Sequence, residues 1–99
     1  GEKMNLHDLI IELEKRDRKQ IVDDGFGIGM SWRGSYTEAA FQPVMYATIG
    51  DMLDHAVELL DSTQDGYLMH GCVDVHIAGC GDCGEPINSF NFKYWDSQK

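Results

Sequence analysis

The residues best suited to hold a metal ion lie close together in the second half of the chain. Cys80 and Cys83 form a Cys-x2-Cys pair in a glycine-rich stretch, a spacing that lets two thiolates reach one Zn²⁺. Cys72 and His76 lie just upstream and are the best-placed further ligands by position. The four residues predict a closed, structural zinc site. Two alternatives stay open: a turn that merely contains free thiols, and a redox pair, although the residues that follow are expected to form a strand and not the helix start that would activate it.

A second group of residues that could bind a ligand occupies positions 32–36, which read Trp-Arg-Gly-Ser-Tyr. A guanidinium pairs with phosphate, aromatic faces stack on bases, and glycine lets a ligand approach the backbone. Arg33 is the only Lys or Arg between residues 20 and 92. The pattern predicts a small-anion or nucleotide site at Trp32, Arg33 and Tyr36. A hairpin with Arg33 on its surface and Trp32 in the core explains the pattern equally well.

Signals for catalysis are weak. Asp54 and His55 are neighbours in an expected helix, where adjacent side chains point apart. Residues 23–29 are glycine-rich but lack the Lys-Ser/Thr ending of a phosphate loop, so we expect a turn that allows close packing. No serine or cysteine lies in a recognisable nucleophile turn. We therefore expect a protein that is not an enzyme.

Charge narrows the range of partners. The 99 residues carry a net charge of −9, and residues 20–99 hold only three Lys or Arg. Such a body repels a polyphosphate backbone, so extended nucleic-acid binding is not expected, whereas docking on a basic protein is compatible with it. Three cysteines, an odd number, favour a reducing compartment, and we expect a cytoplasmic protein without a membrane span.

The elements that must position these residues follow from periodicity. Apolar residues at helical spacing predict helices over residues 5–19 and 48–61, capped by Asn5 and by Thr48. Alternation predicts strands over residues 28–32, 36–42, 67–78 and 90–94, the second ended by Pro43. Residues 79–86 are expected to form a loop. The fold class is therefore α+β, with two helices on a small antiparallel sheet in the order α-β-β-α-β-β.

We expect one domain over residues 1–99, in which residues 1–3 have the character of a cloning remnant. Exposed aromatic residues on several strands predict that copies of the chain associate, because burying them between copies is favourable.

Several short segments of the sequence, in the order in which they occur, also resemble a known group of proteins. Residues 32–36, 38–41 and 48–53, followed by Asp-Gly-Tyr at 65–67 and a valine-rich strand, resemble small bacteriophage proteins. They are most similar to phage anti-defence proteins of the Thoeris anti-defence kind, which sequester nucleotide immune signals. The similarity covers roughly residues 28–85. The strong acidity and the cysteine loop depart from that group.

The resemblance implies a non-enzymatic homo-oligomer that holds a cyclic ADP-ribose-type or cyclic-oligonucleotide signal at subunit boundaries. It implies that Trp32, Arg33 and Tyr36 face this ligand. Two other functions fit the residues. One is an acidic protein-interaction inhibitor of a host defence factor, with a possible likeness to nucleic-acid charge, marked by the carboxylates along residues 51–65. The other is a small zinc-supported accessory domain.

Overall fold

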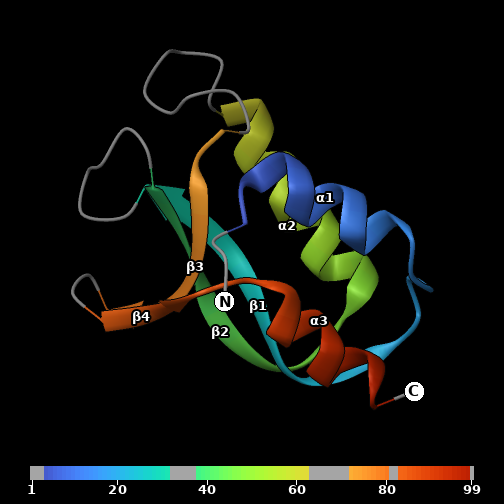
Figure 1. The fold of residues 1–99 in the computed structure, drawn as a ribbon. Helices are drawn as coiled ribbons and strands as arrows, with labels where there is room; N and C mark the ends of the chain where they lie inside the picture. The colour runs from blue at the N-terminus through green and yellow to red at the C-terminus, as the bar shows by residue number, and fades with distance from the viewer. Residues whose placement is uncertain (1–3, 32–37, 63–71, 81–82, 99) are drawn as a thin grey trace.

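The computed structural model describes residues 4–31, 38–62, 72–80 and 83–98. Its elements follow the order α-β-β-α-β-β-α (Figure 1). The described elements are α1 (Leu6–Glu14), β1 (Ile21–Ser31), β2 (Glu38–Thr48), α2 (Ile49–Ser62), β3 (Asp74–Cys80), β4 (Cys83–Pro86) and α3 (Ser89–Asp96). The α+β class is confirmed, but the chain has three described helices where the sequence predicted two.

The sheet has four strands in the order β1-β2-β3-β4 and is mixed. β1 pairs with β2 and β3 pairs with β4 in antiparallel fashion, whereas β2 and β3 are parallel. The prediction of an antiparallel sheet was therefore wrong. The reason is α2, which follows β2 directly and provides the helical crossover that parallel neighbours require.

Both predicted helices are present with their predicted caps. Asn5 accepts a hydrogen bond from the Asp8 N–H at 2.8 Å, and Thr48 Oγ1 accepts one from the Asp51 N–H at 3.1 Å. α1 ends at Glu14 rather than at residue 19. The segment beyond it caps the N-terminus of α2 instead. The backbone oxygens of Arg18 and Gln20 accept hydrogen bonds from the N–H groups of Gly50 and Ile49, respectively. These two bonds satisfy donors that the first turn of a helix leaves unpaired.

The largest error of the sequence prediction concerns residues 90–94, which form part of helix α3 and not a strand. Asn88 caps the helix, and its side chain and that of Asn91 form a reciprocal capping box. The burial follows helical spacing, since Phe92 and Trp95 are buried while Phe90 and Tyr94 are exposed. Alternating aromatic residues suggested a strand, and the cap at Asn88 overrides that signal.

β1 and β2 are each eleven residues long, longer than the sequence predicted. Residues 23–25, expected to turn, lie within β1, and the strand continues because its glycines admit side chains of neighbouring elements. A Cβ on Gly29 would lie 2.7 Å from the Phe41 ring. β2 also runs through Pro43, which was expected to end it. Beyond Phe41 the strand has lost β3 as a neighbour, and proline is tolerated where a strand lies at a sheet edge.

β3 and β4 form a hairpin in which Cys80 and Cys83 are paired across the ladder. Residues 79–86 are thus partly strand and not only the expected loop. Of the strand predicted over residues 67–78, residues 67–71 lie outside the described part of the chain.

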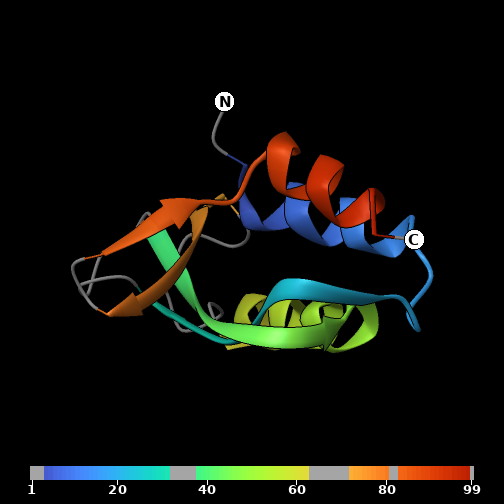
Figure 2. The same cartoon turned by 90° about the horizontal axis from the view of Figure 1, so that it is seen from below.

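One hydrophobic cluster joins all three helices to β1, β2 and β3. α1 and α3 lie on the same side of the β1–β2 ribbon (Figure 2). Arg16 of α1 holds α3 in place, because its Nε and Nη2 each donate to a carboxylate oxygen of Asp96 at 2.8 Å. Its guanidinium also lies 4.5 Å from the centre of the Phe92 ring. The hydrogen bond to Asp96 is the main cause of a raised pKa of Arg16.

Candidate functional site

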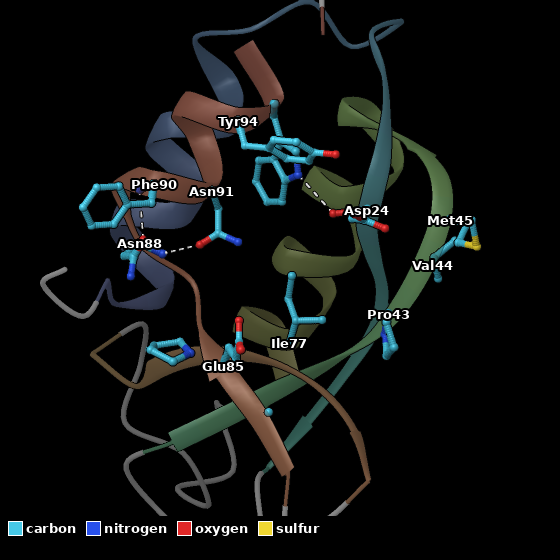
Figure 3. Close-up of a pocket in the computed structure, with 14 residues that line it drawn as sticks. Asp24, Pro43, Val44, Met45, Ile77, Glu85, Asn88, Phe90, Asn91 and Tyr94 are labelled. Carbon is cyan, nitrogen blue, oxygen red and sulfur yellow. Dashed lines mark hydrogen bonds between the residues drawn. The ribbon is translucent and has the colours of Figure 1, made fainter. Parts of the chain in front are cut away.

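In the described part of the molecule, a groove lies between α3, residues 43–45 of β2 and the β3–β4 hairpin. Its volume is about 1030 Å³. In Figure 3 the residues of α3 lie on one side of it and Pro43, Val44 and Met45 on the other. The groove is lined by Asp24, Gly25, Pro43, Val44, Met45, Ile77, Gly84, Glu85, Pro86, Asn88, Phe90, Asn91, Tyr94 and Trp95.

The α3 wall consists of a buried, hydrogen-bonded tryptophan and two exposed aromatic rings. Trp95 is 1% exposed, and its Nε1 donates to the backbone oxygen of Asp24 at 3.0 Å. This bond ties α3 to β1 and sets the width of the groove at that end (Figure 3). Phe90 and Tyr94, four residues apart on the helix, are 62% and 46% exposed. A buried tryptophan thus supports two large rings that remain accessible to a ligand.

The opposite wall is apolar and its strand is irregular. Val44 and Met45 are both exposed, Met45 by 68%. Tyr46, next along β2, has a backbone φ of 61°, a left-handed conformation that is uncommon for a residue with a side chain. Asp23 of β1 donates its N–H to Gln98 Oε1 at 2.8 Å, so the C-terminal tail holds the ribbon near this distortion.

The hairpin closes one end of the groove. Ile77 of β3 and Pro86 of β4 contribute apolar surface there. Gly84 has a φ of 156°, and a Cβ at this position would lie 2.6 Å from the Ala78 Cβ. Only glycine fits this close approach of the two hairpin strands, which keeps β4 close against β3.

The charged residues that line the described part of the groove are all acidic. Asp24 and Glu85 are the charged residues among the described ones that line it, and these include no Lys, Arg or His. Asn88 and Asn91 add amides, but their side chains already serve the helix cap. The arrangement can bury apolar groups and attract a cation. It presents no nucleophile paired with a base among the described lining residues.

The predicted nucleotide-binding residues Trp32, Arg33 and Tyr36 lie outside the described part of the chain. The hypothesis of a site at these residues therefore stays a prediction.

The predicted zinc ligands are described only in part. Cys72 is exposed and His76 is 3% exposed. The Nδ1 atom of His76 lies 3.4 Å from the Ala39 oxygen, and its Nε2 atom lies 3.9 Å from a carboxylate oxygen of Glu38. The backbones of Cys80 and Cys83 face each other, while their side chains lie outside the description. Within the described residues no group of three metal-binding side chains comes together, and the zinc site stays a prediction.

Sequence reasoning missed the groove. Its α3 wall was read as a strand, so Phe90 and Tyr94 were expected on one face of a sheet. The signal that could have identified the wall is Asn88 three residues before Asn91, a reciprocal capping pair that marks a helix start.

Comparison of the chain with family models, curated proteins and solved structures finds no match. Among the described residues, no helix has the length and apolar character needed to cross a membrane.

Proposed function

We propose that this chain is a non-enzymatic binding protein whose groove between α3, β2 and β4 accepts an apolar segment of a basic protein. The observation that carries the proposal is the composition of the groove. Large exposed apolar side chains line one concavity, and among the described residues that line it the charged ones are the carboxylates of Asp24 and Glu85. A protein with net charge −9 attracts a basic partner over a distance, and apolar contact then holds it.

Single exposed apolar residues are ordinary on protein surfaces and carry no functional meaning. The groove differs because exposed apolar residues of two elements, Val44 and Met45 of β2 and Phe90 and Tyr94 of α3, border the same concavity (Figure 3). Contiguous apolar surface in a concavity is the usual character of a binding site. Covering this surface removes it from water, at roughly 25 cal/mol per Å² of apolar area.

The proposal is tested with a display library of random peptides selected on the wild-type protein. Selected peptides should bind wild type and lose at least about tenfold in affinity for Phe90→Ser combined with Tyr94→Ser. Ile11→Ser is the matched control, because Ile11 is an exposed apolar residue on α1 outside the groove. Peptides that bind the groove variant as well as wild type, or that depend on Ile11, would contradict the proposal.

Sequestration of a nucleotide immune signal is the second candidate, and it is supported by the resemblance and by the residue types at 32–36. A phosphate needs a cation in this acidic body, and the described groove lining supplies none. The signal would therefore bind at Trp32, Arg33 and Tyr36, at the boundary between associated copies. Calorimetric titration of cyclic ADP-ribose-type and cyclic-oligonucleotide signals into wild type and Arg33→Ala tests it. Equal affinity of the two proteins would refute the role of Arg33.

A further inference from the structure

Two carboxylates lie at opposite ends of the groove. Asp24 is next to the C-terminal end of α3, because its backbone oxygen accepts the hydrogen bond from Trp95 Nε1. Glu85 is paired with Ile77 in the β3–β4 hairpin, near the start of α3 at Asn88 (Figure 3). Asn88 and Trp95 are about two helical turns apart, which is roughly 10 Å along the axis. The two acids are therefore separated by a distance of this order.

Both carboxylates are accessible to a ligand. Asp24 and Glu85 are exposed, and within the described part of the chain neither carboxylate has an ion-pair partner. Glu12, Asp54 and Asp96, by contrast, each pair with a lysine or arginine of the chain. The two acids of the groove can thus pair with positive charges that a partner supplies.

The surface between the two acids is largely apolar. Ile77 and Pro86 of the hairpin contribute to it, as do Tyr94 and the buried ring of Trp95 on α3. Asn91 adds one polar group, because its Oδ1 is used in the capping box of α3 and its Nδ2 remains a donor for a ligand carbonyl oxygen (Figure 3). A ligand that fits this surface has an apolar middle between two cationic groups.

We infer that the groove recognises a segment of the partner protein in which two basic residues flank an apolar one. One basic side chain pairs with Asp24 and the other with Glu85, while the apolar side chain packs against Ile77 and Tyr94. At roughly 3.3 Å per residue of extended chain, basic residues two to four positions apart reach both carboxylates. The inference rests on the proposed function and adds the residues by which the groove selects its partner.

The separation of the acids favours two cationic groups over one. A metal ion lies within about 2.6 Å of its carboxylate oxygens, so one ion cannot bind both Asp24 and Glu85. A polyamine also carries separated charges, but its narrow chain would leave most of a groove of about 1030 Å³ unfilled. A protein segment supplies side-chain volume as well as charge and is therefore the better occupant.

A double-mutant comparison tests the pairing. Peptides selected on the wild-type protein should carry the two basic residues, and each is replaced in turn by an uncharged analogue, citrulline for arginine or acetyl-lysine for lysine. Each replacement should weaken binding to wild type by at least about threefold. Asp24→Asn should abolish the effect of one replacement, and Glu85→Gln that of the other. Asp61→Asn is the charge-matched control, because Asp61 is exposed on α2 outside the groove, and both effects should persist in it.

Four results would overturn the inference. Replacement effects that survive in both Asp24→Asn and Glu85→Gln would show that the basic residues respond to the net charge and not to these two carboxylates. Spermidine that binds more tightly than the peptides, and only when both acids are present, would assign the acids to a small organic cation. Selected peptides that depend on Phe90 and Tyr94 but lack the two basic residues would remove the inference and leave the groove as a binding site. A selection that yields no peptide dependent on Phe90 and Tyr94 would overturn the proposed function and this inference together.

Discussion

The two strands of the β1–β2 ribbon are equal in length but differ in how their backbones are covered. β1 is tied to the C-terminal region by the bonds from Trp95 Nε1 to Asp24 O and from Asp23 N–H to Gln98 Oε1. β2 loses its neighbour β3 after Phe41 and presents five exposed residues in a row. The contrast separates surface used to stabilise the fold from surface left accessible for binding.

Trp95→Ala should lower the free energy of unfolding by about 3–5 kcal/mol, because a buried aromatic residue is removed from the core. The variant also loses the bond to Asp24 and the packing of Trp95 against Phe26 and Phe92. Tyr94→Ala, one residue away on the exposed side, should cost less than about 1 kcal/mol. Thermal and denaturant unfolding of both variants measures the difference. Similar losses would show that the exposed side of α3 is also structural.

Gly29→Ala and Gly27→Ala compare the same change at two positions of β1. At Gly29 the new methyl group would lie 2.7 Å from the ring of Phe41, which is fully buried and cannot move away. At Gly27 it would lie 2.9 Å from a methyl group of Val44, which is partly exposed and can rotate. We expect Gly29→Ala to cost about 1–3 kcal/mol and Gly27→Ala clearly less. Urea unfolding tests the order, and the reverse order would contradict it.

Acidification should weaken the ion pairs that Glu12 makes at the end of α1 slightly. The hydrogen bond from Lys15 to Glu12 at 2.9 Å is the main cause of a pKa of Glu12 below its ordinary value of 4.5, and Arg16 adds to it. A carboxyl with a lowered pKa stabilises the folded state above its ordinary value, and this contribution is lost as the pH falls through the lowered one. Because the side chains are partly solvated, the effect is at most about 0.5 kcal/mol.

The measurement is unfolding of wild type and Glu12→Gln between neutral and acid pH. The stability gap between the two proteins should narrow as the pH falls. A gap that is constant over this range would show that Glu12 does not contribute through its charge.

The part of the fold that could be predicted from sequence is the part with local signals. The stripe of Leu6, Leu9 and Leu13 and the caps Asn5 and Thr48 predicted α1 and α2, and both are present. The parallel pairing of β2 with β3 and the passage of β2 through Pro43 depend on which strands become neighbours, and no local pattern encodes that choice.

The groove was beyond prediction for the same reason. Met45 and Tyr94 are far apart in the chain and line one groove only because α3 is anchored on β1. The sites predicted from residue types, at Trp32, Arg33 and Tyr36 and at the cysteine loop, remain predictions. Calorimetric titration with nucleotide signals tests the first site, and elemental analysis for zinc tests the second.

The most direct test of the central claim compares one charge at two exposed apolar positions. Met45→Glu places a carboxylate on the β2 wall of the groove, whereas Val57→Glu places one on an exposed position of α2 outside the groove. Both variants should fold, as checked by circular dichroism and melting curves. Met45→Glu should weaken binding of a groove-selected peptide by at least about tenfold, and Val57→Glu by less than about twofold. Unchanged binding to Met45→Glu, with the fold intact, would contradict the claim that the groove is the binding surface.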